Sequence, residues 1–215
     1  ETIRENRAKA LAKKDEVEEC LIKSMNYFMP ENSGEAFIDI DHVRKCKLKD
    51  SYDWTNKDVY VGLDLAETED NTAISMITYD EILKKVICKS FAFIPKARVE
   101  SKSRKEHVDY NIEIKKETCF ACGNEVVDYG AVENFVLNIE KKYKCKVKQI
   151  GYDRRNALSS AQKFENEKYD CVEVVQHSSI LHPTIKWLKE LILNQDFAYE
   201  ENKLLEINFV NARCT

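Results

Sequence analysis

The order of strand-like and helix-like segments constrains the fold of this chain more than any single motif does. Three consecutive runs rich in β-branched and aromatic residues, at residues 59–65, 72–79 and 85–94, are separated by polar turns. Strands joined by short turns usually pair antiparallel, so these runs predict a three-stranded meander.

After residue 124 the pattern changes to an alternation of helices and strands. The predicted elements are, in chain order, helix 129–143, strand 147–152, helix 157–167, strand 171–175 and helix 180–193. This alternation is typical of parallel strands joined by helical crossovers.

Two last strand-like runs, at residues 197–199 and 204–210, predict a closing hairpin around the polar residues 200–203. Antiparallel strands followed by parallel units make a mixed β-sheet, and the helices between them pack on its faces. The sequence therefore predicts an α/β domain.

Two further segments frame this domain. Residues 1–56 read as a helical lead-in, with a helix expected over residues 4–29 and a short one over 38–46. Residues 95–124 are polar and without periodicity, which favours a long insertion or flexible loop. The main domain is expected to span residues 57–215 and to carry this insertion.

Composition excludes several classes of protein. The 215 residues, 43% of them hydrophobic, suffice for one substantial core. Lys and Arg total 34 against 38 Asp and Glu, so a nucleic-acid surface must be local. Eight scattered cysteines favour reduced thiols in a cytosol, and the apolar runs are too short to span a bilayer.

Aspartates occupy unusual positions in two apolar strands. Asp64 interrupts the run 59–65, and Asp153 follows the run 147–152 immediately before a helix. A carboxylate in an apolar strand is costly unless it is paired or binds a cation, and sites in α/β sheets form beyond the carboxyl ends of strands. The alternative is an edge aspartate that faces solvent or pairs with a lysine.

A third aspartate, Asp70, lies six residues after Asp64 at the start of the next predicted strand. It can return to the same sheet edge, although beside Asn71 it is equally compatible with simple turn chemistry. Carboxylates grouped at a sheet edge suit Mg²⁺ or Mn²⁺, and a pair of such ions about 3.5–4 Å apart can hydrolyse a phosphodiester. The three aspartates are therefore candidate metal ligands and catalytic residues.

The strings around these aspartates resemble a known family. VGLDLAETEDNTA (residues 61–73) resembles the first strand and turn of the nuclease domain of phage terminase large subunits, where one aspartate follows another by six positions. IGYDRRNA (150–157) is similar to the family's second acidic motif, with Asp153 at the acid position. VVQ (174–176) and INFVNA (207–212) are similar to the stretches that follow, and SMNYF (24–28) and EAFI (35–38) are similar to the preceding linker.

The resemblance implies an RNase H-like fold and a metal-dependent DNA endonuclease that uses two divalent ions, Mg²⁺ or Mn²⁺, to cut concatemeric phage DNA during packaging. It further implies double-stranded DNA, portal protein, small terminase subunit and an ATPase domain as partners, in the cytoplasm of a bacterial host. The alternatives are another RNase H-like nuclease of the transposase or resolvase type, or a catalytically silent DNA-binding or portal-docking module.

Two departures from the family pattern qualify this expectation. The family's last catalytic aspartate falls after the Asn-containing final segment, so it is expected beyond Thr215, and the chain is expected to be a truncated fragment with weak activity. No G-x-x-x-x-G-K-[ST] phosphate-binding loop occurs in the sequence. The packaging ATPase is therefore not part of this chain.

Several other residues are weaker candidates. Arg154 and Arg155 follow the second motif and can hold DNA phosphates, or form an ion pair at a helix start. Cys119 and Cys122 form half of a zinc-ribbon pattern, which His107 and Cys145 could complete only through a long loop, so plain thiols are expected. His177 and His182 flank a turn and are candidates for a general base. The favoured interpretation is that both are ordinary surface residues without a catalytic role.

Overall fold

The computed structural model describes residues 35–66 and 70–213. The helix predicted over residues 4–29 lies outside the described residues. Within the described part, none of the helices is both long enough and apolar enough to cross a membrane.

The chain divides into two compact units. One comprises Glu1–Phe37 with Asn211–Thr215, and the other comprises Ile38–Val210 and carries the β-sheet. In the first unit, the structure describes an antiparallel bridge between Ala36 and Arg213.

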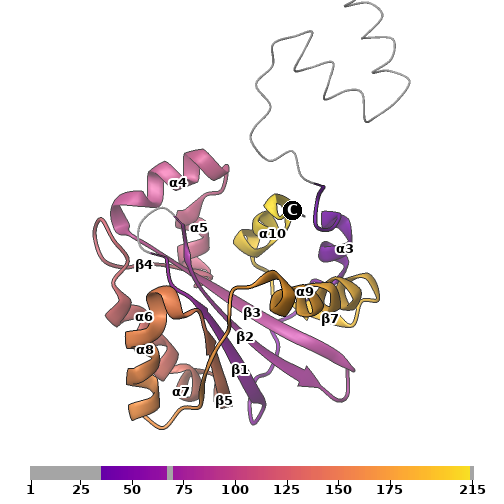
Figure 1. Ribbon diagram of the computed structural model, residues 1–215. Helices are drawn as coiled ribbons and strands as arrows, with labels where there is room; N and C mark the ends of the chain where they lie inside the picture. The colour runs from indigo at the N-terminus through magenta and orange to yellow at the C-terminus, as the bar shows by residue number, and fades with distance from the viewer. Residues whose placement is uncertain (1–34, 67–69, 214–215) are drawn as a thin grey trace, which may run out of the picture. The chain divides into compact units, whose positions relative to one another are not determined.

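The predicted meander is confirmed. Strands β1 (Asp58–Asp64), β2 (Thr72–Asp80) and β3 (Lys85–Ile94) follow one another, and each pairs antiparallel with the next (Figure 1). The register is continuous from Thr72, opposite Phe93, to Asp80, opposite Lys85, so the turn between β2 and β3 is tight.

The parallel half of the sheet is also confirmed. Strand β5 (Lys146–Tyr152) lies parallel beside β1, and β6 (Cys171–Glu173) lies parallel beside β5. The crossover between them is α8 (Arg154–Asn166). The sheet has seven strands in the order β4-β3-β2-β1-β5-β6, with β7 also paired to β3. This is the mixed α/β sheet that the sequence predicts.

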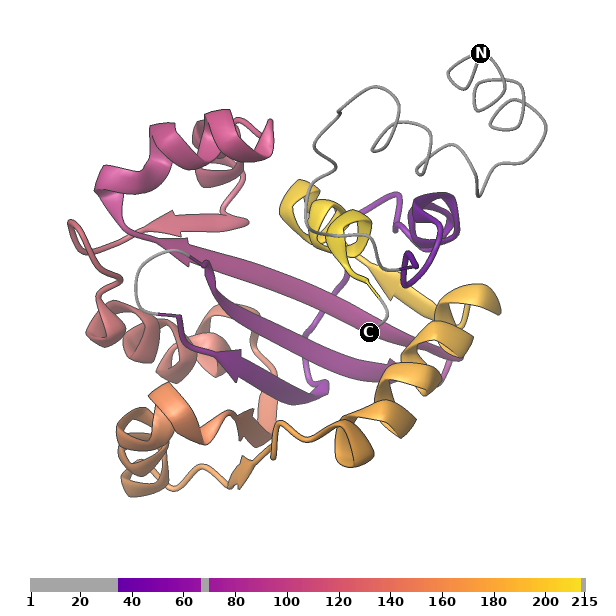
Figure 2. The ribbon, with the colours of Figure 1, turned by 45° about the horizontal axis from the view of Figure 1, so that its top comes forward.

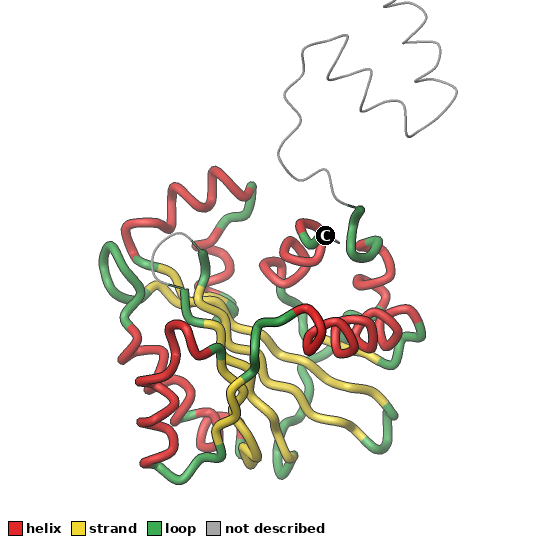
Figure 3. The backbone as a smooth tube through the Cα atoms, in the orientation of Figure 1, coloured by secondary structure: helices red, strands yellow, loops and turns green. Residues whose placement is uncertain are grey.

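The main core lies between one face of the sheet and three helices. Residues of β1 alternate between exposed and buried, which places Val59, Val61 and Leu63 on the inner face. Figure 3 shows the helices that follow the insertion beside the strands, and these are α6 (Tyr129–Leu137), α7 (Ile139–Tyr143) and α8. Each buried aliphatic or aromatic side chain contributes about 1.5–3 kcal/mol, so this face accounts for much of the stability.

The single helix predicted over residues 129–143 is broken at Asn138. Asn138 ends α6 and begins α7, and its side-chain amide donates to the Asn134 carbonyl at 2.7 Å. An asparagine that bonds the preceding turn competes with continued helical hydrogen bonding, which explains the break.

The prediction that residues 95–124 are irregular was wrong. This insertion contains η1 (Lys96–Arg98), α4 (Val99–Glu106), α5 (Tyr110–Lys115) and β4 (Cys119–Ala121). Figure 2 shows these elements together at one end of the sheet. They are too short to show periodicity. They are stabilised by a second apolar cluster whose members are Ala92, Ile94, Val108, Tyr110, Cys119 and Leu204.

The predicted closing hairpin was also wrong. Strand β7 (Phe197–Tyr199) forms, but it pairs parallel with β3, and the next segment is the helix α10 (Lys203–Asn211). The edge of β3 is already taken by β4 and β7, and the Ser90 carbonyl between them accepts from the Asn202 side chain at 2.8 Å. Since no ladder remains free there, the apolar segment folds as a helix that Asn202 caps through the Leu205 amide at 3.0 Å.

The remaining helices are α3 (Ile40–Lys45), inside the predicted range 38–46, and α9 (Ser178–Leu193). In Figure 1 they lie with α10 on the opposite side of the sheet from α6 and α8. The predicted aspartates lie at the carboxyl ends of β1 and β5.

Candidate active site

Asp64 is the last residue of β1 and points to the face of the sheet opposite the main core. The alternation that buries Leu63 exposes Asp64 and Gly62. Opposite Asp64 on β2 lies the small residue Ala73, which leaves the carboxylate uncovered on that side. Asp64 therefore projects from the end of a central strand.

Asp153 reaches the same sheet edge from the neighbouring strand. Leu63 of β1 is in register with Tyr152 of β5, and because the two strands are parallel, Asp64 and Asp153 follow at the same level. Asp153 is also the N-cap of α8, where its side chain accepts from the Arg155 amide at 3.2 Å. This cap restrains one oxygen and leaves the other available.

A pocket of about 280 Å³ joins the two aspartates. Its described lining is Gly62, Leu63, Asp64, Ala73, Ser75, Gly151, Tyr152, Asp153, Val174 and Gln176. None of these residues is basic, so neither carboxylate has a cationic partner within the described lining. The structure thus brings together two of the three predicted ligands.

Two glycines create the space between the aspartates. Gly62 and Gly151 are register partners on adjacent strands, and both line the pocket. A Cβ on Gly151 would lie 3.3 Å from the Val174 side chain, so a larger residue there would crowd the pocket. Sequence reasoning missed this feature, although the repeated pattern G-x-D in both motifs carries the signal.

The electrostatics of Asp64 reflect this crowding of acids. Partial burial in the pocket raises its pKa above the ordinary value, and the carboxylates of Asp153 and Asp70 raise it further. Like charges favour the protonated form of a carboxyl, and a bound cation would remove that penalty. The pocket is therefore electrostatically prepared for a cation.

Asp70 lies near these two aspartates without lining the pocket. It is exposed, and it acts on Asp64 through its charge. Two residues after Asp70, the Thr72 hydroxyl accepts from the Ala66 amide at 2.9 Å and donates to the Ala66 carbonyl at 3.1 Å. Over residues 35–66 and 70–213, no three His, Cys, Asp or Glu side chains form a ready metal-binding group.

Asn156 connects the two acidic segments. It lies in the first turn of α8, and its side-chain amide donates to the Leu65 carbonyl at 2.8 Å, directly after Asp64. This bond fixes the start of α8 against the end of β1. Asn156 belongs to the second motif, but its role cannot be read from the sequence.

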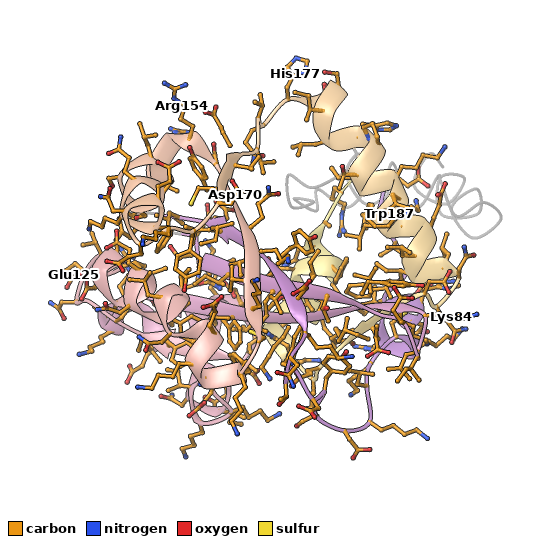
Figure 4. The ribbon with its side chains drawn as sticks, turned by 90° about the horizontal axis from the view of Figure 1, so that it is seen from below. Lys84, Glu125, Arg154, Asp170, His177 and Trp187 are labelled. Carbon is orange, nitrogen blue, oxygen red and sulfur yellow. The ribbon has the colours of Figure 1, made fainter. Side chains whose placement is uncertain are left out.

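The two arginines do not enter the pocket. Arg154 is exposed and lies 3.6 Å from Glu173, and Figure 4 shows its side chain directed outward from the start of α8. Arg155 is exposed as well. The sequence leaves two roles open for Arg154 and Arg155, contact with DNA phosphates and an ion pair at the helix start. Their exposed positions are compatible with both.

The weaker candidates lie elsewhere. Cys119 is fully buried in the second apolar cluster, and burial raises its pKa to about 12. Cys122 also has a raised pKa because of burial, and neither thiol belongs to a metal-binding group in the described part of the chain. His177 caps α9, with its Nδ1 accepting from the Ser179 amide at 3.3 Å.

The fold and the pocket together define a class of protein. A meander followed by parallel β-α-β units, with paired carboxylates at the ends of adjacent central strands, is the arrangement of an RNase H-like α/β domain. A family model described as "Terminase large subunit, endonuclease domain" matches residues 1–215. The chain belongs to this family, which favours the terminase interpretation over the transposase or resolvase alternative.

Solved structures agree on the fold. The large terminase of bacteriophage HK97 is similar with a TM-score of 0.73 at 18% identity, over 97% of this chain and 42% of that chain. The large terminase nuclease of thermophilic phage G20c with bound magnesium is similar with a TM-score of 0.51 at 11% identity, over 84% of this chain and 82% of that one. The chain thus spans less than half of the HK97 protein. No curated protein matches it.

Proposed function

We propose that this chain is the metal-dependent endonuclease domain of a phage terminase large subunit, which cleaves concatemeric viral DNA during genome packaging. The observation that carries the proposal is the pocket in which Asp64 and Asp153 lie side by side with no basic residue in its described lining. Membership of the terminase endonuclease family makes phosphodiester hydrolysis the expected chemistry.

The residues of the pocket fit a hard divalent cation. Mg²⁺ takes oxygen ligands, keeps several waters and is commonly held by one or two carboxylates plus substrate phosphate. The paired glycines leave room for such an ion, and the described lining holds no basic side chain that could neutralise Asp64, whose pKa is raised by burial and by the neighbouring carboxylates. Two divalent ions, Mg²⁺ or Mn²⁺, would activate the attacking water and stabilise the leaving oxygen.

Each acidic residue has a proposed task. Asp64 and Asp153 bind metal from adjacent strands, and Asp70 supports them from the neighbouring turn. Asn156 keeps the two strands' acids at a fixed separation through its bond to Leu65. Ligands held on rigid strands and braced by such hydrogen bonds satisfy the geometric precision that metal-assisted hydrolysis needs.

The partners follow from the family. Double-stranded DNA is the proposed substrate, with Arg154 and Arg155 placed to contact phosphates beside the pocket. Portal protein, small terminase subunit and the ATPase domain of the same polypeptide are proposed partners, in the cytoplasm of the bacterial host. In this reading residues 1–56 link the ATPase domain to the nuclease domain of residues 57–215.

Nicking of supercoiled plasmid in Mn²⁺ tests the proposal. Asp64→Asn and Asp153→Asn should each lower the cleavage rate by at least about a hundredfold, because loss of a metal-binding carboxylate removes several kcal/mol of transition-state stabilisation.

The matched control is Asp58→Asn, at the other end of the same strand and on the same face, where Asp58 pairs with Lys148 at 3.3 Å. This variant should cleave like the unmodified chain. DNA binding with neither cleavage nor Mn²⁺ binding by the unmodified chain would instead identify a silent docking module, whereas Mn²⁺ binding with weak cleavage fits the truncated domain expected from the sequence.

A further inference from the structure

The insertion makes a buried contact with the turn that carries Asp70. Tyr110, the first residue of α5, is fully buried, and its hydroxyl accepts from the Asn71 side-chain amide at 2.8 Å. Asn71 directly follows Asp70. Tyr110, 39 positions further along the chain, is therefore bonded to the residue beside Asp70.

A chain of hydrogen bonds fixes the direction of this contact. The Tyr110 hydroxyl donates to Glu106 at 2.5 Å, and Glu106 pairs with Lys102 at 3.0 Å. An ionised carboxylate can only accept, so the single hydroxyl proton of Tyr110 is used toward Glu106. Burial raises the pKa of Tyr110 above its ordinary value, which keeps that proton in place.

The orientation of the Asn71 amide follows from this chain. Since the Tyr110 oxygen must accept, the NH₂ group of Asn71 faces it and the amide oxygen faces the other way. That oxygen is buried and has no hydrogen-bond partner among the described residues. The bond to Tyr110 therefore fixes which way the amide of Asn71 faces.

Asn71 is therefore restrained from two sides. The next residue, Thr72, is bonded to Ala66, and Tyr110 holds the Asn71 side chain from the insertion. Asp70 lies directly before Asn71 and already acts on Asp64 electrostatically. A restraint on Asn71 is therefore a restraint on the chain directly beside Asp70.

We infer that Tyr110 is a positioning residue for the metal site, acting through Asn71 to hold Asp70 toward Asp64. This role rests on the proposed function and gives the insertion a specific part in it. Tyr110 does not touch substrate or metal. Residues that orient metal ligands typically change metal affinity by about 10–100-fold when they are replaced.

The test is Mn²⁺ binding by the 215-residue chain, measured by electron paramagnetic resonance, a readout independent of cleavage. Tyr110→Phe removes only the hydroxyl and should weaken Mn²⁺ affinity by about tenfold. Asn71→Ala should weaken it similarly. The double variant should be no weaker than either single one, since both changes break one connection.

Tyr199→Phe is the matched control. Tyr199 is likewise fully buried and donates to a glutamate, Glu206, at 3.0 Å, but it lies on β7, which pairs with residues 86–88 of β3. It should lose thermal stability much as Tyr110→Phe does and keep Mn²⁺ affinity unchanged.

Two outcomes overturn the inference in different ways. Normal Mn²⁺ affinity in folded Tyr110→Phe, with binding abolished in Asp64→Asn, would remove Tyr110 from the site and leave the proposed function intact. Equal Mn²⁺ binding by the unmodified chain and Asp64→Asn, or no binding by either, would overturn the proposed function and this inference together.

Discussion

At the scale of single residues, the candidate site depends on two glycines as much as on two aspartates. Gly62 and Gly151 precede Asp64 and Asp153 by two positions each, and all four residues line the pocket. Because the two glycines are register partners, the spaces they leave coincide. The local sequence thus determines which acid each strand carries, and the register between β1 and β5 brings the two acids together.

The raised pKa of Asp64 has a measurable consequence for stability. The folded chain binds a proton at Asp64 more readily than the unfolded chain does, so ionised Asp64 lowers stability at pH values above its folded pKa. This penalty fades as the pH falls toward the ordinary carboxyl pKa of about 3.9. Asp64→Asn should therefore melt at a higher temperature than the unmodified chain at pH 7.5 in a chelator.

Thermal melting at several pH values checks this prediction. The advantage of Asp64→Asn should shrink between pH 7.5 and pH 4.5, while Asp58→Asn shows no such advantage. Added Mn²⁺ should reverse the order, because only the unmodified chain gains binding energy, about 2.7 kcal/mol at a hundredfold excess over Kd. A lower melting temperature for Asp64→Asn in chelator at pH 7.5 would contradict the electrostatic interpretation.

At the scale of elements, the hairpin of β2 and β3 has its own buried anchor. The Asp80 carboxylate accepts from the Ile82 and Leu83 amides at 2.9 and 2.8 Å and from Lys57 at 2.9 Å, and it also accepts from the Tyr52 hydroxyl. Asp80 is 4% exposed. One side chain therefore caps the turn and ties it to the segment before β1.

These bonds hold the pKa of Asp80 well below its usual range, with the Leu83 amide as the largest cause, followed by Lys57 and Tyr52. Stability from Asp80 is therefore fully present above the ordinary carboxyl pKa of about 3.9 and is lost as the pH falls below it. Asp80→Asn should keep the turn but lose the charged bond to Lys57, at a cost of about 2 kcal/mol.

Urea unfolding at pH 7 and at pH 3 checks this prediction. Asp80→Asn should be less stable than the unmodified chain at pH 7. The difference should narrow at pH 3, because the Asp80 carboxyl then takes up a proton on unfolding, while it stays ionised in the folded chain. An equal deficit at both pH values would indicate a packing effect instead of an ionic one.

At the scale of the whole molecule, two separate apolar clusters form the core of the described residues. The larger lies between the sheet and α6 to α8, and the smaller joins the insertion, the end of β3 and α10. The smaller one surrounds Tyr110, so packing far from the pocket supports the proposed contact with Asn71. The insertion and the C-terminal helix are expected to be lost together if this cluster is opened.

Leu204→Ala tests the contribution of α10 to the smaller cluster. Leu204 is 3% exposed, and its truncation should cost about 2–4 kcal/mol, as for other buried leucines. Ile112→Ala on α5, where the side chain is 48% exposed, is the control and should cost much less. Urea unfolding measures both, and an equal effect of the two changes would show that α10 does not pack as described.

The sequence by itself determined the meander, the parallel units and the identity of the paired acids. Residues that alternate along β1, and a helix that starts directly after Asp153, are local patterns that the chain displays without its tertiary context. The expectation that Asp64 and Asp153 meet rested on the rule that sites in α/β sheets form beyond the carboxyl ends of strands, and the structure places both in one pocket.

Only the tertiary structure decided the rest. Residues 204–210 are apolar enough for a strand, but β4 and β7 already occupy the edge of β3, so the segment becomes a helix. The elements of the insertion are too short for periodicity to reveal, and they depend on a cluster built from distant residues. The bond from Tyr110 to Asn71 likewise spans two segments that only folding brings together, because a hydrogen bond between distant residues leaves no local pattern in the sequence.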